Sequence, residues 1–261
     1  MAHAKQTSTT VTDAGKAKGE TRIVIPELNL PRVIFLCIGE SSLVQQRFSE
    51  KSRQQMISDQ EAGSTTRKGR KLPPKDFKAC FEAAQHRTEA GGWGHPASAF
   101  RNAAISACRI CNFHMTKGKL SIFSKATSLD SVDATPLVDI IAAPPEMNIS
   151  PVRLPNGSLD MRARPMWKKW CMAVEMEYDA DQFTEKDMYN LMVRVGKQVG
   201  IGEGRHDSKG SCGVGWGCFR LAESEADWKQ ACKEALQNPK SLQKKVTKKA
   251  SKTRSKKCAR R

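Results

Sequence analysis

Length, composition and charge bound the class of protein. The chain has 261 residues, of which 39% are hydrophobic and 27% charged, and its formal net charge is +17. A chain of this kind can bury one substantial core and still carry polar tails. It contains no run of 18 apolar residues, and residues 1–20 lack the apolar segment of a signal peptide. We therefore expect neither a membrane span nor secretion, and a cytoplasmic protein.

The first part of the chain predicts an arm, a strand and an insertion. Residues 1–22 have no periodicity and are expected to be a disordered arm preceding a core over 23–225. The apolar run Val33–Ile38 is typical of a buried strand. Residues 49–75 are polar and basic, and a connection of this length predicts a mobile, functional insertion.

A helix is predicted to open at Pro96, because the first helical position tolerates a residue without an N–H group. Cys108 and Cys111 have the spacing of a zinc-ligand pair, and the possible partners would be His114, His206, Cys212 and Cys218. The second close ligand pair of a structural site is missing, so we expect no metal and no cofactor. The two cysteines instead share one face of the helix with Phe100, Ala103, Ala104 and Ala107. The nine cysteines, without a secretion signal, are expected to be reduced thiols.

The middle of the chain predicts strands and a hairpin. Strand-like stretches occupy 119–127 and 135–143, and Asn156-Gly157 is a strong hairpin signal within a predicted hairpin over 150–165. Arg153, Arg162 and Arg164 lie on its two arms. Side chains alternate between apolar and polar around Ala173, which predicts a half-buried strand.

The next elements complete an alternating order. Thr184 and Asp187 form a variant of the capping box, and the helix that they open has an apolar stripe made of Met188, Leu191, Met192, Val195 and Val199. A short amphipathic helix is expected over 226–237. The order strand, helix, strand occurs twice, which predicts an α+β fold with a ferredoxin-like or RRM-like sheet, insertions and a glycine-rich C-terminal loop.

The glycine-rich segment Val199–Phe219 holds seven glycines between Gly200 and Gly217, together with apolar residues that a flexible linker would lack. Phosphate-binding loops of nucleotide hydrolases and of dinucleotide-binding folds place their glycines before a helix, whereas these follow one, so we reject both classes. Every second residue of Gly213–Gly217 is glycine. This pattern predicts a strand whose bare face packs against the small-residue face of the helix at Phe100–Cys111.

Two basic regions are candidates for binding phosphate. Within the glycine-rich segment, Arg205, His206 and Lys209 would place donors beside exposed backbone amides, which suits a sugar-phosphate backbone. From Asn238 onward the chain has eleven Lys or Arg residues and no acid. This predicted disordered tail, 238–261, favours a polyanion-binding arm, although a solubility segment or a nuclear-targeting signal would have the same composition. Its candidate contacts are Lys244, Lys245, Lys248 and Lys249.

Two motifs resemble the RAMP superfamily of CRISPR-associated proteins, in particular the repeated backbone subunit of effector complexes, and suggest a phage-encoded relative. One is the glycine-rich segment, and the other is the helix motif that runs approximately I-P-x-S-S-h-K-G-h-h-R in that family. Pro96, Ser98, Phe100 and Arg101 match this motif, whereas Asn102 stands where glycine is usual. The resemblance covers residues 22–221.

The resemblance implies a protein that lines up head to tail along single-stranded RNA. The hairpin at 150–165 would be the thumb that interrupts the bases, and Ser98, Arg101, Arg205 and Lys209 would face phosphate. Some relatives cut RNA with an aspartate in the insertion after the first strand, but no motif surrounds Asp59, the only aspartate in 49–75.

We therefore predict a non-catalytic protein that binds single-stranded nucleic acid, RNA in preference to DNA, as a homo-oligomer or filament away from membranes. Two alternatives stay open. One is a metal-independent ribonuclease of the RAMP type, for which His206 is the candidate residue; the other is a structural or protein-interaction subunit of a larger nucleoprotein complex. The five histidines are scattered along the sequence, whereas acid–base catalysis needs positioned partners.

Overall fold

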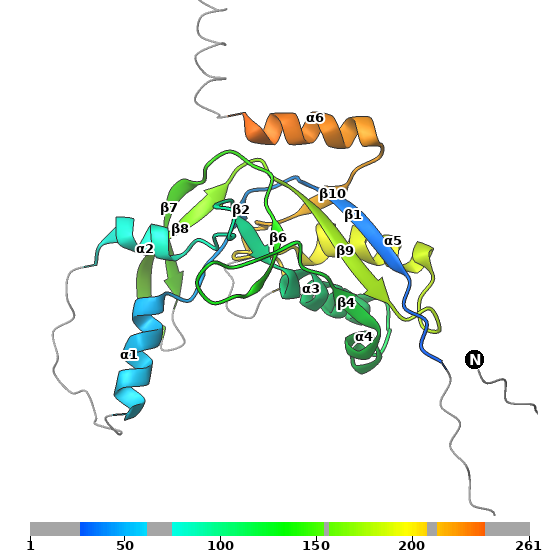
Figure 1. The fold of residues 1–261 in the computed structure, drawn as a ribbon, viewed down its shortest axis with the longest axis horizontal. Helices are drawn as coiled ribbons and strands as arrows, with labels where there is room; N and C mark the ends of the chain where they lie inside the picture. Colours follow the sequence, from blue (N-terminus) through cyan, green and yellow to red (C-terminus); the bar gives the residue numbers. More distant parts are fainter. Residues whose placement is uncertain (1–26, 62–74, 154–156, 208–212, 238–261) are drawn as a thin grey trace, which may run out of the picture.

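A computed structural model describes residues 27–61, 75–153, 157–207 and 213–237 (Figure 1). Within these ranges the protein is a mixed α+β fold, with six α-helices, one π-helical turn and three antiparallel sheets. The predicted arm at 1–22 and the predicted tail at 238–261 both lie outside the described residues.

The strands are, in chain order, β1 (Arg32–Gly39), β2 (Leu43–Val44), β3 (Gly94–Pro96), β4 (Ile122–Ser124), β5 (Ser128–Leu129), β6 (Pro136–Asp139), β7 (Glu146–Arg153), β8 (Leu159–Trp167), β9 (Cys171–Tyr178) and β10 (Phe219–Leu221). The helices are α1 (Glu50–Glu61), α2 (Phe77–Ala83), α3 (Ala97–Ile110), α4 (Met115–Ser121), α5 (Glu185–Arg194), the π-helical turn η1 (Val195–Val199) and α6 (Glu225–Leu236). The sheets have the orders β10-β1-β9-β4, β2-β8-β7 and β3-β6-β5.

The four-stranded sheet is the centre of the fold. Its two central strands, β1 and β9, pair from Arg32 opposite Glu177 to Ile38 opposite Cys171. The alternation predicted around Ala173 is confirmed over 172–176, where Met172, Val174 and Met176 are fully buried and Ala173 and Glu175 are partly exposed. The strand is not half-buried along its whole length, because Cys171 and Glu177 of the predicted polar face are also buried. The strand predicted at Val33–Ile38 is confirmed as the central strand β1, although Ile34 within it is exposed. The strand predicted at 119–127 is reduced to β4, because α4 continues to Ser121.

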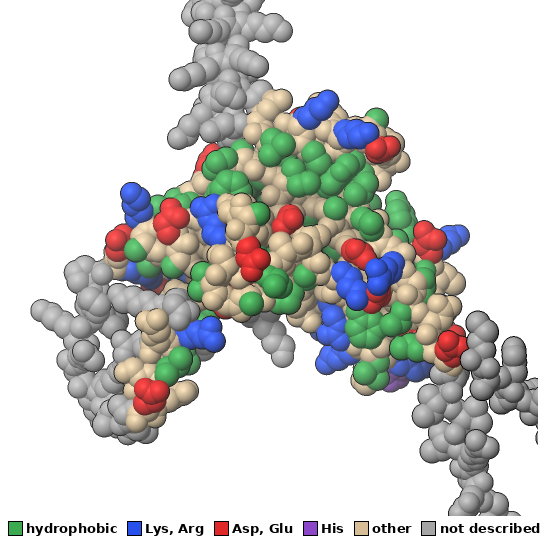
Figure 2. All heavy atoms as spheres, in the orientation of Figure 1, with side chains coloured by type: hydrophobic (Ala, Val, Ile, Leu, Met, Phe, Trp, Pro, Cys, Tyr) green, Lys and Arg blue, Asp and Glu red, His purple; other side chains and the backbone are tan. Residues whose placement is uncertain are grey.

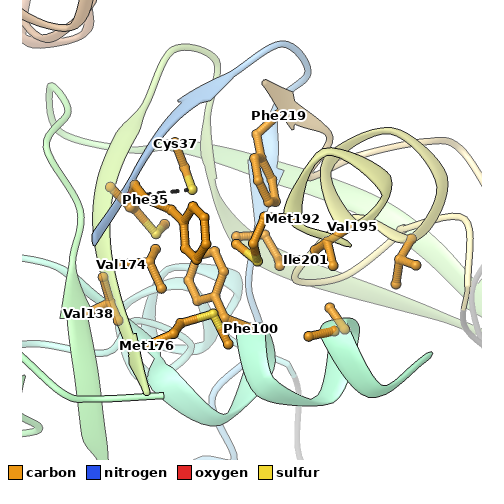
Figure 3. Packing of buried hydrophobic residues seen from close by; sticks show 14 of the residues in the cluster. Phe35, Cys37, Phe100, Val138, Val174, Met176, Met192, Val195, Ile201 and Phe219 are labelled. Carbon is orange, nitrogen blue, oxygen red and sulfur yellow. Dashed lines mark hydrogen bonds between the residues drawn. The ribbon is translucent and has the colours of Figure 1, made fainter. Parts of the chain in front are cut away.

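Helices cover both faces of this sheet (Figure 1). On one face, α3 and α5 enclose the main core, in which Phe100 and Phe219 meet edge to face with ring centroids 6.1 Å apart (Figure 3). The alanine and cysteine face of α3 is buried as predicted, except that Cys111 lies past the helix end and is exposed. On the other face, α6 packs over a small cluster that includes Ile38 and Cys171.

The helix predicted at Thr184 is confirmed in detail. The Thr184 hydroxyl accepts a hydrogen bond from the Asp187 N–H group (3.2 Å), and the Asp187 carboxylate accepts one from the Thr184 N–H group (3.0 Å). This reciprocal capping box satisfies two donors at the start of α5. The whole predicted apolar stripe of α5 and η1 is buried.

Strands β7 and β8 form the predicted hairpin, with paired residues from Glu146 opposite Met166 to Arg153 opposite Leu159. Residues 154–156, which include the Asn of the predicted turn, lie outside the described residues. The segment 49–75, predicted to be a mobile insertion, contains α1 in its first half, and Figure 1 shows this helix standing apart from the central sheet.

Residues Gly213–Gly217 do not form the predicted strand. Gly213, Gly215 and Gly217 have φ values of +63°, +82° and +73°, so every second residue has a left-handed backbone instead of an extended one. Strand pairing begins only at Phe219. The predicted packing of a bare glycine face against α3 is also wrong, because a Cβ at Gly215 would instead lie 2.8 Å from Cε1 of His206.

Backbone hydrogen bonds hold the described part of the glycine-rich segment against β2 and the residue before it. The Gly217 N–H group donates to the Ser42 carbonyl (2.8 Å), and the Glu203 N–H group donates to the Val44 carbonyl (2.8 Å). A Cβ at Gly202 would lie 2.5 Å from the Val44 carbonyl oxygen. The glycines thus allow two stretches of backbone to touch, and the described part of the segment packs on β2.

Candidate nucleic-acid interface

Two of the residues predicted to face phosphate lie near the start of α3. Ser98 is exposed, and among the described residues no side chain forms a capping hydrogen bond at this end of the helix. The Arg101 guanidinium donates from Nε to the Ile122 carbonyl (2.8 Å) and from Nη2 to the Lys119 carbonyl. Arg101 therefore holds the junction of α4 and β4, and phosphate binding by Ser98 and Arg101 stays a prediction.

Arg164 is buried between the hairpin and the glycine-rich segment, with 4% of its surface exposed. Its Nε donates to Oε1 of Gln46 (3.1 Å), and its Nη2 lies 3.6 Å from Oε2 of Glu203. The side chain links β8 to the segment at 200–207, so it organises this region from the inside.

Arg205 closes the glycine-rich loop on itself. Its Nη1 donates to the Gly202 carbonyl (2.8 Å), and its Nε donates to the Asp207 carbonyl (3.1 Å). The loop position suggested an exposed charge, but the side chain is half-buried and both bonds are internal.

We expect Arg205→Ala to lower the free energy of unfolding by about 1–3 kcal/mol, because two carbonyls lose a charged donor. Urea denaturation measures this, with Arg194→Ala on the exposed side of α5 as the matched arginine control. An Arg205→Ala protein as stable as the control would mean that the loop carbonyls are satisfied equally well by water.

His206 is exposed and lines a depression of about 220 Å³ together with Arg109 and Asp207. Arg109 Nη2 binds both carboxylate oxygens of Asp207, at 2.9 and 3.0 Å. Over the described part of the chain, no carboxylate forms an ion pair with His206. The pair of base and orienting acid that a ribonuclease would use is therefore not assembled at His206 in these residues.

The other predicted contacts are only partly visible. Lys209 lies outside the described residues, as do Lys244, Lys245, Lys248 and Lys249. Arg153 is the last residue of β7, and Asp59 lies within α1. The structure therefore places no charge of the tail.

The hairpin has one polar and one apolar face. Residues paired across two strands lie on the same face, and Ser150 is paired with Arg162, whereas Pro151 is paired with Met161. Part of the apolar face is open to solvent, whereas Ala163 and Pro165 on the same face are buried. Its exposed side chains include Met147, Ile149 and Met161, at 41%, 47% and 44% exposure.

Beside the hairpin lies a cavity of about 390 Å³, which we call the hairpin pocket. It is formed by β8, α2 with the residue before its cap, and the segment after β2. Its lining residues are Gln46, Arg47, Phe48, Ser49, Lys75, Cys80, Asp160, Arg162 and Ala163. Of the predicted site residues, Arg162 lines this pocket, together with two further basic side chains, Arg47 and Lys75.

One carboxylate holds the basic side chains at the outer side of the hairpin pocket. Lys75 Nζ lies 2.8 Å from Oδ1 of Asp160, and Arg162 Nε lies 3.3 Å from Oδ2 of the same residue. The hydrogen bond from Lys75, followed by that from Arg162, holds the pKa of the Asp160 carboxyl below its usual value. Lys75 Nζ also donates to the Met161 carbonyl (2.5 Å).

A buried polar network supports the third basic side chain, Arg47. Its Nε lies 3.5 Å from Oδ2 of Asp130, and its Nη2 lies 3.5 Å from Oδ2 of Asp133. Asp130 has no exposed side-chain surface and also accepts the hydrogen bond of His86 Nδ1 at 2.7 Å. Arg47 is therefore fixed at the inner side of the pocket.

A second buried histidine lies next to this network. The Gln45 amide nitrogen donates to the Gly94 carbonyl (3.1 Å) and to His95 Nδ1 (3.2 Å), and its oxygen accepts from the His86 N–H group (3.0 Å). Burial, with smaller effects from His86 and Arg205, lowers the pKa of His95 to about 3, so this ring is neutral at physiological pH.

Sequence reasoning missed Arg47, Phe48 and Lys75. Arg47 and Phe48 directly precede the 49–75 insertion, Lys75 is its last residue, and all three are far in sequence from Arg162. The one available signal was the insertion itself, because long loops in compact domains carry function and their ends are fixed by the scaffold.

The structure gives no sign of a metal centre or a membrane span where it describes the chain. No three His, Cys, Asp or Glu side chains gather as ligands there, and none of the helices in those ranges has the length and apolar character needed to cross a bilayer. No protein-family model matches the sequence, and no curated protein is significantly similar to it.

Proposed function

We propose that the protein is a non-catalytic, single-stranded nucleic-acid-binding protein that oligomerises along RNA or single-stranded DNA. The hairpin pocket is the observation that carries this proposal. Three basic side chains line this pocket, two of them bound to the Asp160 carboxylate, and Phe48 lines it as well with 60% of its surface exposed. Basic grooves with exposed aromatic rings suit single strands, because the charges bind phosphates and the rings stack on unpaired bases.

The arrangement of the central sheet supports a ferredoxin-like core of the RAMP kind. In chain order, α3 lies between β1 and β4, and α5 lies between β9 and β10, while the sheet has the order β10-β1-β9-β4. Two interleaved strand–helix–strand halves produce such an order. The outer face of the sheet is covered by α6, so the nucleic acid is proposed to bind along the hairpin and not on the sheet.

The amphipathic hairpin supports a thumb-like role. Exposed apolar surface is unfavourable in a monomer and often marks an interaction site, so this face is explained if bases or a neighbouring subunit cover it. The polar face carries Arg162 toward the hairpin pocket. One hairpin would thus offer apolar contacts to bases on one side and charge to phosphates on the other.

A charge-removal experiment tests this proposal. We expect Lys75→Ala with Arg162→Ala to weaken binding of a fluorescein-labelled single-stranded 20-mer and to reduce the slope of log K against log salt by about 1.4, since each lost phosphate contact in a single strand contributes about 0.7. Fluorescence anisotropy at several salt concentrations measures both. The loss should be similar for different sequences, because phosphate contacts do not distinguish bases.

The control removes the same charge elsewhere. Lys186→Ala with Arg194→Ala lies on the exposed side of α5, and these changes should leave the slope nearly unchanged. Equal slopes for both double variants would reject the hairpin pocket as a contact, and absence of binding to any single strand at low salt would reject the function. Sedimentation of complexes on strands of increasing length tests oligomerisation, which requires the number of bound copies to rise with length.

A further inference from the structure

Building on the proposed function, we infer that the hairpin pocket receives one unpaired nucleotide, whose base stacks on Phe48 and whose phosphate takes the place of the Asp160 carboxylate between Lys75 and Arg162. The cavity volume of about 390 Å³ is in the range of small-molecule sites. The inference goes beyond backbone binding, because it assigns a place to a base.

Phe48 is an exposed ring on an anchored segment. The backbone N–H group of its neighbour Arg47 donates to the Ala84 carbonyl (3.1 Å), and the Arg47 side chain is fixed by Asp130 and Asp133. A base that covers this ring removes apolar surface from water, which is favourable because the Phe48 side chain is 60% exposed. Because the segment beneath it is fixed, little ordering is needed when a base stacks on the ring.

The Asp160 carboxylate marks the place of an anion. It already accepts hydrogen bonds from Lys75 Nζ and Arg162 Nε, and it is the single acid among the lining residues of the pocket. A phosphate group offers more oxygen acceptors than a carboxylate, and Lys and Arg side chains bind both. The two cations are therefore held ready for phosphate, while Asp160 competes with it.

The juxtaposition of ring and cation pair favours a nucleotide over a simple anion. An inorganic phosphate would satisfy the cations and leave Phe48 exposed, whereas a nucleoside would cover Phe48 and leave the cations with Asp160. A base in a duplex has no free face to stack, so the nucleotide must be unpaired.

The experiment uses the full chain with adenosine monophosphate, adenosine and inorganic phosphate as separate probes. Binding is measured by broadening of the adenine proton and phosphorus NMR signals. We expect the monophosphate to bind at least about tenfold more tightly than either adenosine or phosphate. Phe48→Ala should weaken binding of the monophosphate by about tenfold and leave binding of phosphate unchanged. Phe48→Leu should not restore full binding of the monophosphate, because leucine has a similar bulk but cannot stack.

Asp160→Asn should change the binding affinity in the opposite direction. Removal of the competing carboxylate should strengthen the binding of both the monophosphate and phosphate severalfold, whereas Lys75→Ala should weaken the binding of both. Tyr189→Ala, which removes an aromatic ring that is 49% exposed on α5, is the matched control and should change nothing. Thermal melts of the variants establish that each is folded.

Three outcomes overturn the inference. They are phosphate binding as tightly as the monophosphate, Phe48→Ala binding like wild type, and Asp160→Asn binding no more tightly. If the wild-type chain binds a single-stranded 20-mer with a salt slope but does not bind the monophosphate, the nucleotide site is wrong and the proposed function stands. If no single strand binds, both are wrong.

Discussion

Replacing Gly217 with alanine should destabilise the protein by about 3 kcal/mol or more, the largest effect we expect from any single methyl group. Gly217 has φ +73°, and a Cβ there would overlap the carbonyl group of Ile201, which is backbone and cannot rotate away. The Gly217 N–H and carbonyl groups are both used, by Ser42 and Ile201 respectively, so the residue cannot shift without breaking these bonds. Chemical denaturation of the purified variant measures the loss.

The control for Gly217 is Gly91→Ala. Gly91 also has a left-handed backbone, with φ +82°, but apart from its two chain neighbours no described residue has an atom within 4 Å of its hypothetical Cβ. Gly91→Ala should therefore lower the free energy of unfolding only by the cost of a left-handed alanine, about 1–2 kcal/mol. A Gly217→Ala protein no less stable than the Gly91→Ala protein would show that the backbone around Gly217 is loose and does not pack on Ser42 and Ile201.

Asp130→Ala should also cost about 3 kcal/mol or more in the free energy of unfolding. The carboxylate is completely buried and faces both His86 and Arg47. Among the described residues, its removal leaves Arg47 with Asp133 as its acidic partner and leaves His86 Nδ1 without an acceptor, and buried polar groups that lose their partners are costly. Urea denaturation with intrinsic tryptophan fluorescence provides the measurement.

Two further variants separate charge from hydrogen bonding at this position. Asp130→Asn keeps an oxygen for His86 but removes the charge that faces Arg47, so its loss should be smaller than that of Asp130→Ala. Asp181→Ala, at an exposed position before α5, should stay within about 0.5 kcal/mol of wild type. The buried network would lose its proposed role if Asp130→Ala were as stable as Asp181→Ala.

The sequence by itself determined the elements whose signals are local. The alternation around Ala173 predicted β9, because a strand buried on one face must alternate, and Thr184 with Asp187 predicted the start of α5, because capping needs only residues three apart. The small face of α3 and the pairing of β7 with β8 were also readable, since helical spacing and a turn signal are short-range patterns.

Only the tertiary structure decided what the glycines and the arginines contact. Alternating glycines predict a bare strand face when every residue is assumed to be extended, but Gly213, Gly215 and Gly217 have positive φ, and Gly217 is held there by Ser42, which is distant in sequence. Arg101 and Arg205 donate hydrogen bonds to backbone carbonyl groups, and no pattern in the sequence predicts these contacts.

The hairpin pocket depends on tertiary structure most strongly. Its lining comes from 46–49, from 75 and 80, and from 160–163, three segments that are brought together only when the hairpin, α2 and the chain after β2 pack against one another. Periodicity and capping report which face of an element is buried, and they carry no information about which two surfaces will meet. A site built between elements therefore becomes visible only in the folded chain.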